Sequence, residues 1–187
     1  MVTKDNIFCN GEKREITSIH LDNAKSVIER GLKYFVGDNY QWASEYNEIV
    51  DWLDNNKHKG LLCYGNVGRG KSLICENILP NIFRYYLRLN LWKFDGFSIN
   101  DKREQLRECD CAALIDDFGV ESISKKFGES TDVFSEFITF AEKRKQLVIL
   151  STNLTLDEIK AKYGVRTLDR LVYLTHPVLF TGQSFRR

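Results

Sequence analysis

The stretch Leu61–Ser72 reads LLCYGNVGRGKS, and it decides the fold of this chain. It passes from a short apolar run, typical of a buried strand, into a glycine-rich turn and then into a segment with helical spacing of apolar residues. The turn follows the pattern GxxxxGK(S/T). Its glycines let successive backbone N–H groups point at one anion, and the start of the following helix favours negative charge. The stretch therefore predicts a strand, a phosphate-binding loop and a helix, in that order.

The residues of this loop have separate predicted tasks. Lys71 can reach the β and γ phosphates of a nucleotide, and the Ser72 hydroxyl can bind Mg²⁺. Arg69 either adds charge near the phosphates or faces solvent, and the second alternative is favoured. The predicted nucleotide-binding positions are Gly65, Asn66, Val67, Gly68, Arg69, Gly70, Lys71 and Ser72.

Apolar runs outside this stretch indicate a parallel sheet. Strands are expected at 89–94, 112–115, 147–150 and 178–180, alternating with segments of helical periodicity. Such alternation is typical of an α/β fold whose parallel sheet carries helices on both faces. Pro80 is expected to kink or end the helix after the loop, because proline lacks the N–H of a helical hydrogen bond.

The composition and the pattern of apolar runs limit the classes to which the protein can belong. The chain has 187 residues, 43% of them hydrophobic, with a net charge of +1, which argues against a wholly basic nucleic-acid coat. There is no apolar run long enough for a membrane span and no secretory signal at the start, so a cytoplasmic location is expected. Five cysteines without a CxxC pair are expected to be free thiols. Two apolar stripes predict a short helical segment over 1–58, ahead of a core over 59–187.

Polar side chains follow two of the expected strands. Asp116 suits the role of an acid that holds Mg²⁺ at a strand end, and Asp117 could activate the attacking water as a general base. The alternative is that the acidic pair caps a helix or shapes a turn. Asn153 could hydrogen-bond the attacking water or the γ-phosphate, or it could be an ordinary turn asparagine.

Two arginines lie four positions apart near the end of the chain. Arg166 and Arg170 share a helix face if their segment is helical. An arginine presented to the γ-phosphate of a neighbouring subunit would act as an arginine finger. The alternative, which the spacing alone favours, is surface charge with Asp169 as the partner.

In this order, the motifs resemble those of AAA+ ATPases of the DnaC/DnaI helicase-loader and IstB type. The resemblance covers about 59–187 and includes IDDFG at 115–119, STN at 151–153, YGVR at 163–166 and FTGQSFR at 180–186. It implies that the AAA+ P-loop core has Walker A at 65–72 and Walker B at Asp116 and Asp117. It also implies that Asn153 is sensor 1 and that Arg170 is the finger acting in trans, with Arg166 as its companion.

The resemblance implies an ATP-binding, Mg²⁺-dependent ATPase that acts in DNA replication as an ATP-switched assembly factor. Hydrolysis is expected to be slow and stimulated by assembly. The implied partners are further copies of the chain on ATP binding, a replicative helicase or a transposase, and single-stranded DNA. One alternative is the IstB-like ATPase subunit of a transposition system. The other is a small-molecule P-loop kinase, which would need a lid with arginines.

Overall fold

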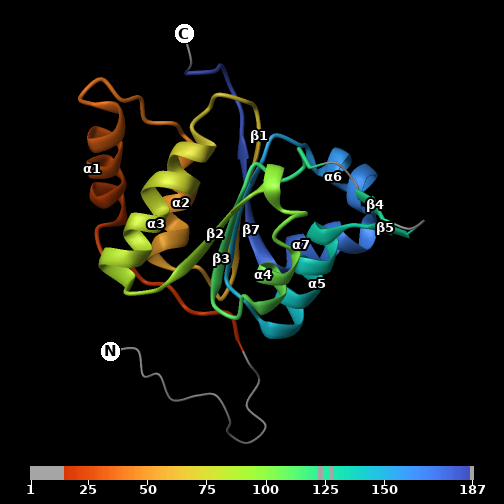
Figure 1. Ribbon diagram of the computed structural model, residues 1–187. Coiled ribbons are helices and arrows are strands. Elements are labelled where there is room, and N and C mark those ends of the chain that lie inside the picture. The colour runs from red at the N-terminus through yellow and green to blue at the C-terminus, as the bar shows by residue number, and fades with distance from the viewer. Residues whose placement is uncertain (1–14, 122–123, 127–128, 186–187) are drawn as a thin grey trace, which may run out of the picture.

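Five parallel strands form the central sheet of the computed structural model, which describes residues 15–121, 124–126 and 129–185 (Figure 1). The strand order across the sheet is β2-β3-β6-β1-β7. The bounds are Gly60–Gly65 for β1, Leu91–Asp95 for β2, Ala112–Asp116 for β3, Val148–Thr152 for β6 and Thr175–Phe180 for β7. A separate antiparallel pair consists of β4, Ser124–Lys126, and β5, Glu129–Thr131. The predicted α/β class with a parallel sheet is confirmed.

Helices cover both faces of this sheet, as predicted (Figure 1). One side carries α1, Ala24–Val36, and α2, Tyr46–Asp54, together with the helix that follows the glycine-rich loop. The other side carries α4, Arg103–Glu108, α5, Val133–Arg144, α6, Leu156–Tyr163, and α7, Val165–Leu174. A short 3-10 turn, Gly96–Ser98, follows β2. No helix among the described residues is both long enough and apolar enough to cross a membrane.

The buried core runs through β6 and continues into the N-terminal helices. Every residue of β6 is buried, and β6 pairs with β1 on one side and β3 on the other. Ile28 of α1 and Ile49 of α2 belong to the same buried cluster as the strands. The side chain of Asn56 accepts from Ile19 N–H at 2.8 Å and donates to Lys59 O at 3.0 Å, which ties the segment before α1 to the start of β1. The predicted boundary between 58 and 59 stays a prediction.

Pro80 is expected from the sequence to kink or end the helix after the loop, and the helix does not end there, so the second of these expectations is wrong. Helical turns run on as a π-helix over Leu73–Ile78, α3 over Leu79–Ile82 and a second π-helix over Phe83–Leu87. Proline has no N–H for the carbonyl of Glu76, four residues earlier. Lys93 of β2 supplies the missing donor, since its ammonium donates to Glu76 O at 2.8 Å.

The cysteines that the structure describes are free, in agreement with the expectation. Cys63, Cys75 and Cys109 are buried and Cys111 is partly buried. Burial is the largest cause that raises the pKa of the Cys109 thiol to about 11. Cys9 lies outside the described residues.

We expect Ile149→Ala to lower the free energy of unfolding by about 2–5 kcal/mol, because it leaves a cavity in the fully buried central strand. Urea unfolding followed by circular dichroism measures the change. Val165→Ala is the matched control, since Val165 is 63% exposed on α7. Equal urea midpoints for the two variants would contradict this placement of the core.

Candidate functional site

The glycine-rich loop leaves the carboxyl end of β1 and turns into the helix that follows. Gly65, Gly68 and Gly70 have φ values of 110°, 75° and 93°, a region that side chains disfavour. Gly70 is constrained twice, because a Cβ there would lie 2.1 Å from the hydroxyl of Tyr46. The predicted strand, loop and helix are therefore present in the predicted order.

Lys71 is held inside the loop. Its ammonium donates to Gly65 O at 2.9 Å and to Asn66 O at 2.6 Å, and the side chain is buried. Burial lowers the pKa of Lys71, while the charge of Asp117 opposes that shift. The positively charged ammonium of Lys71 thus lies among loop carbonyls at the carboxyl edge of the sheet.

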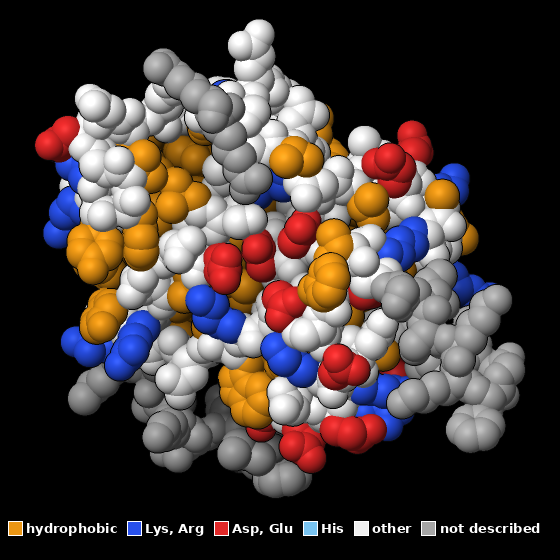
Figure 2. All heavy atoms as spheres, turned by 45° about the horizontal axis from the view of Figure 1, so that its top comes forward, with side chains coloured by type: hydrophobic (Ala, Val, Ile, Leu, Met, Phe, Trp, Pro, Cys, Tyr) orange, Lys and Arg blue, Asp and Glu red, His pale blue; other side chains and the backbone are white. Residues whose placement is uncertain are grey.

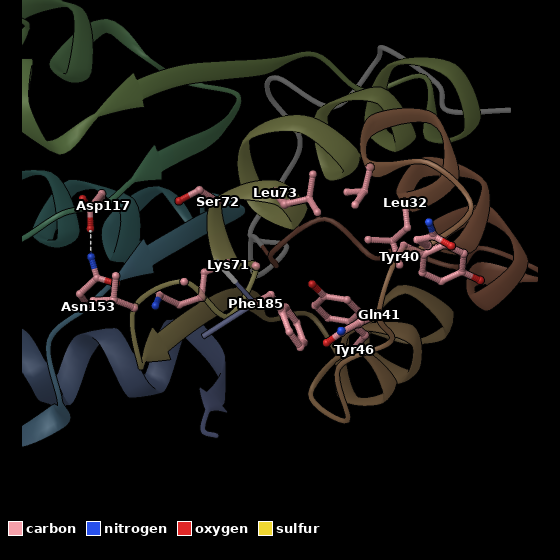
Figure 3. A pocket seen from close by; sticks show the side chains of 15 residues that line it. Leu32, Tyr40, Gln41, Tyr46, Lys71, Ser72, Leu73, Asp117, Asn153 and Phe185 are labelled. Atoms are coloured by element: carbon pink, nitrogen blue, oxygen red, sulfur yellow. Dashed lines mark hydrogen bonds between the residues drawn. The ribbon is translucent and has the colours of Figure 1, made fainter. Parts of the chain in front are cut away.

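Two acids stand at the carboxyl end of β3, and β6 holds them in place. The hydroxyl of Ser151 donates to the Asp116 carboxylate and accepts from Asp117 N–H at 2.9 Å. Asp117 adopts a left-handed conformation with φ of 51°. Asn153 donates its side-chain N–H to Asp117 Oδ1 at 2.7 Å (Figure 3). Because β3 and β6 are neighbours, the predicted acids and the predicted asparagine meet.

A cavity of about 760 Å³ opens beside these groups, within the size range of small-molecule sites. The polar end holds Lys71, Ser72, Asp117 and Asn153 (Figure 3). The opposite end holds aliphatic and aromatic side chains, Leu32, Leu73, Tyr40, Tyr46 and Phe185, together with the amide of Gln41 (Figure 3). Val36 and Asn39 also line the cavity.

The polar end also suits a divalent cation. Asp95 ends β2 opposite Asp116 of β3, and acidic side chains gather near the middle of this face in Figure 2. Hydrogen bonds from Ser98 are the main reason that the pKa of Asp95 lies below its usual value. Carboxylate and hydroxyl oxygens are the ligands that Mg²⁺ prefers. Ser72, which lines the cavity, and Asp116, at the end of β3, carry oxygen donors of this kind, and their assignment to Mg²⁺ stays a prediction.

Most of the predicted loop positions reach this cavity. The loop residues that line it are Val67, Gly68, Gly70, Lys71 and Ser72. Asp116 precedes Asp117 in the chain, and the Ser151 hydroxyl contacts both the Asp116 carboxylate and the Asp117 N–H. Gly65 and Asn66 shape the loop through their carbonyls.

Arg69 does not face solvent, so the favoured prediction for it is wrong. Its guanidinium donates through Nε to Glu45 Oε1 at 3.1 Å and through Nη2 to Glu45 Oε2 at 3.2 Å. The Arg69 side chain is 16% exposed and that of Glu45 is 4% exposed. A carboxylate buried to this degree needs a cationic partner, and Arg69 provides it. Arg69 is not among the residues that line the cavity.

Arg166 and Arg170 lie on α7 and do not line the cavity of their own chain. Arg170 donates to Glu142 Oε2 at 2.9 Å and to Thr139 Oγ1 at 3.0 Å. The suggested pairing with Asp169 is therefore wrong, because α5 packs against α7 and presents Glu142 instead. Arg166 is exposed.

Several site residues escaped the sequence analysis. Ser151 carried a signal, since it is a polar residue at the end of an apolar strand, two positions before Asn153. Tyr46 looked like part of a helical stripe, and it is indeed buried, but its hydroxyl also lies at the cavity. Glu45 carried no signal, because it meets the loop only through the tertiary fold. Phe185 belongs to the stretch FTGQSFR at 180–186, but nothing in that stretch indicated a contact with the loop.

The sequence and the fold of this chain were compared with those of known proteins. No protein-family profile matches the sequence, and no curated protein matches it. Solved structures do match. The crystal structure of the DnaC helicase loader has a TM-score of 0.58 at 17% identity, covering 77% of this chain and 95% of that chain. DnaI has a TM-score of 0.54 at 16% identity, covering 88% of this chain and 86% of that chain. AMPPCP-bound DnaA from Aquifex aeolicus has a TM-score of 0.55 at 14% identity, covering 79% of this chain and 50% of that chain.

The parallel five-stranded sheet with helices on both faces has the AAA+ P-loop NTPase fold of these structures. Within that class, the chain has the fold of the DnaC and DnaI helicase loaders. The resemblance inferred from the motifs is confirmed at the level of the fold.

We expect Ser151→Ala to lower the free energy of unfolding by about 1–3 kcal/mol, because the buried Asp116 carboxylate loses its donor. Ser98→Ala is the matched control. It breaks a similar serine–aspartate contact, at 2.5 Å to Asp95, on the exposed surface and should cost about 1 kcal/mol or less. Urea unfolding at neutral pH compares the two. A smaller loss for Ser151→Ala than for Ser98→Ala would contradict the bridging role of Ser151.

Proposed function

We propose that this protein is an ATP-binding, Mg²⁺-dependent ATPase of the helicase-loader type, which acts in DNA replication as an ATP-switched assembly factor. One observation carries the proposal: Lys71, Ser72, Asp117 and Asn153 meet at the polar end of one cavity whose other end holds aliphatic and aromatic side chains. A nucleotide has a matching division, with charged phosphates at one end and a flat aromatic base at the other. The cytoplasm is the proposed location.

The chemistry assigns a role to each group at the polar end. Lys71 neutralises the β and γ phosphates, and Ser72 and Asp116 would hold Mg²⁺. The metal would supply charge neutralisation at the phosphate oxygens. Asp117 accepts a proton from a water molecule as that water attacks the γ-phosphorus and the bond to the ADP oxygen breaks. Asn153, within hydrogen-bond distance of Asp117, orients that carboxylate.

The aromatic end of the cavity favours a ligand that carries a base, such as a nucleotide, over a phosphate compound without a base. Tyr40, Tyr46 and Phe185 present ring surfaces of the kind on which bases stack. The kinase alternative would need arginines over the cavity. Among the described residues that line it, none is an arginine.

Assembly would complete the site in trans. Arg170 is held on the surface of α7 and is about one-third exposed, so its guanidinium is accessible to a neighbouring copy. A head-to-tail contact that brings α7 to the cavity of the next copy would place Arg170 and Arg166 near its γ-phosphate.

The proposed partners are a replicative helicase and single-stranded DNA, with a transposase as the alternative to the helicase. The similar solved structures include the DnaC helicase loader and DnaA bound to AMPPCP and single-stranded DNA. The surface also offers exposed aromatic rings close to arginines. Arg30 lies 5.8 Å from the ring centre of Tyr86, and Arg84 lies 5.4 Å from that of Tyr85. Rings near positive charge are what single-stranded nucleic acids stack on.

Lys71→Ala and Asp117→Asn are expected to separate binding from chemistry. Lys71→Ala should weaken Mg²⁺-ATP binding roughly 100-fold, because it removes a buried charge that contacts the phosphates. Asp117→Asn should keep the Kd within about threefold while hydrolysis falls roughly 100-fold. Calorimetry and phosphate release measure the two quantities. Lys160→Ala and Asp157→Asn, both exposed on α6, are the controls. Unchanged ATP binding by Lys71→Ala would refute the proposed site.

Arg170→Ala should leave nucleotide binding intact and abolish the rise in hydrolysis per chain at high protein concentration. The reason is that a finger acts only on a neighbour's phosphate. Glu142→Gln is the matched control, because it breaks the same ion pair but keeps the guanidinium. Light scattering with a non-hydrolysable ATP analogue reports assembly in parallel. If Arg170→Ala hydrolysed ATP as fast as the unmodified protein at every concentration, the finger assignment would be wrong.

A further inference from the structure

A buried carboxylate joins three distant segments beside the cavity. Glu45, just before α2, accepts from both nitrogens of the Arg69 fork, from Thr181 N–H at 2.8 Å and from the Ser44 hydroxyl at 3.0 Å. Burial raises the pKa of Glu45, but hydrogen bonds, that from Arg69 foremost, outweigh burial and hold it below its usual value. The carboxylate is therefore ionised at neutral pH, and the contact with Arg69 is a charge-assisted, two-pronged one.

The segment 181–185 is fastened to the outside of the glycine-rich loop by further contacts. Phe185 N–H donates to Gly68 O at 2.9 Å, and the Asn66 side chain donates to Gly182 O at 3.0 Å. The Arg69 guanidinium lies 4.4 Å from the centre of the Phe185 ring. The same ring lines the cavity (Figure 3).

Arg69 thus occupies a central position. One face of its guanidinium covers Phe185, and its edge binds Glu45, so both its charge and its plane are used within the chain. Although Arg69 belongs to the phosphate loop, it does not line the cavity. It contacts the ring of Phe185, which does line the cavity.

We propose that Arg69 and Glu45 are positioning residues that couple nucleotide binding to the docking of the segment 181–185, whose Phe185 forms a wall against the base. This inference rests on the proposed function. It assigns Arg69 to the base end of the site through Phe185, not to the phosphates. By linkage, a nucleotide that contacts Phe185 stabilises the docked segment to the same degree that the docked segment stabilises the nucleotide.

Arg69 could act in two ways, by contacting phosphate or by positioning Phe185, and the two ways predict different effects on the binding of ATP and of inorganic tripolyphosphate. A guanidinium that contacted phosphate would contribute equally to ATP and to inorganic tripolyphosphate. A guanidinium that positions Phe185 contributes only to a ligand that carries a base. Lysine in place of arginine separates the roles further, because it keeps the charge but loses the planar fork.

The test compares Mg²⁺-ATP with Mg²⁺-tripolyphosphate by calorimetry on the full chain. Arg69→Thr, Arg69→Lys, Glu45→Gln and Phe185→Ala should each raise the Kd for ATP roughly tenfold, about 1.4 kcal/mol, and change the Kd for tripolyphosphate less than about twofold. Lys160→Ala, which removes an exposed positive charge on α6 far along the chain from the loop, is the control and should change neither. Phe185→Ala alters a residue at the edge of the fold, so it guards against loss of folding as the explanation.

Hydrogen exchange gives a second readout. In the unmodified protein, ATP should slow exchange at the amides of Thr181 and Phe185, and Arg69→Thr should remove that protection.

Each of the following results would overturn the inference. Equal losses for ATP and tripolyphosphate would assign Arg69 to the phosphates. Unchanged ATP binding in all four variants would remove the coupling altogether. If the unmodified protein bound neither ligand, the proposed function itself would fall, and the inference with it. Binding of both ligands by the unmodified protein, without selective losses in the variants, overturns the inference alone.

Discussion

The pairing of β6 with β1 on one side and β3 on the other is the constraint on which the rest of this structure depends. It is a buried backbone ladder, and it brings three carboxyl ends to one edge of the sheet. The glycine-rich loop comes from β1, the two acids from β3, and Ser151 and Asn153 from β6. Ser151 turns this adjacency into fixed geometry, because its hydroxyl contacts both the Asp116 carboxylate and the Asp117 amide. Any loss of register between these strands would separate the groups.

Much of this edge could be predicted from the sequence, because its signals are local. The loop needs glycines at fixed spacing, and apolar runs that end in acids or amides mark parallel strands with polar carboxyl ends. Those patterns predicted the parallel sheet and helices on both faces. They also indicated Lys71, Ser72, Asp117 and Asn153, which line one cavity. The roles of these residues stay predictions.

The rest could not be predicted, because it depends on contacts between segments far apart in the chain. The orientation of Arg69 is set by Glu45 and Phe185, neither of which is near it in sequence. Where the helix passes through Pro80, the Glu76 carbonyl accepts from Lys93, on the next strand, in place of the N–H that proline lacks. Arg170 pairs with Glu142 instead of the adjacent Asp169, since α5 packs along α7. In each case a charged side chain binds a partner that only the tertiary fold brings close.

The two carbonyls that hold Lys71 have a consequence for which anions can enter the loop. The ammonium has three N–H donors, and the carbonyls of Gly65 and Asn66 take two of them in hydrogen bonds worth on the order of 1 kcal/mol net each. A ligand that needs more than one donor from Lys71 has to compete with these carbonyls. A single weakly charged oxygen recovers little of the cost of displacing them, whereas a chain of phosphates offers several charged oxygens at once. The loop's own carbonyls thus compete with an anion for the Lys71 ammonium, and this competition favours ligands that present several charged oxygens together.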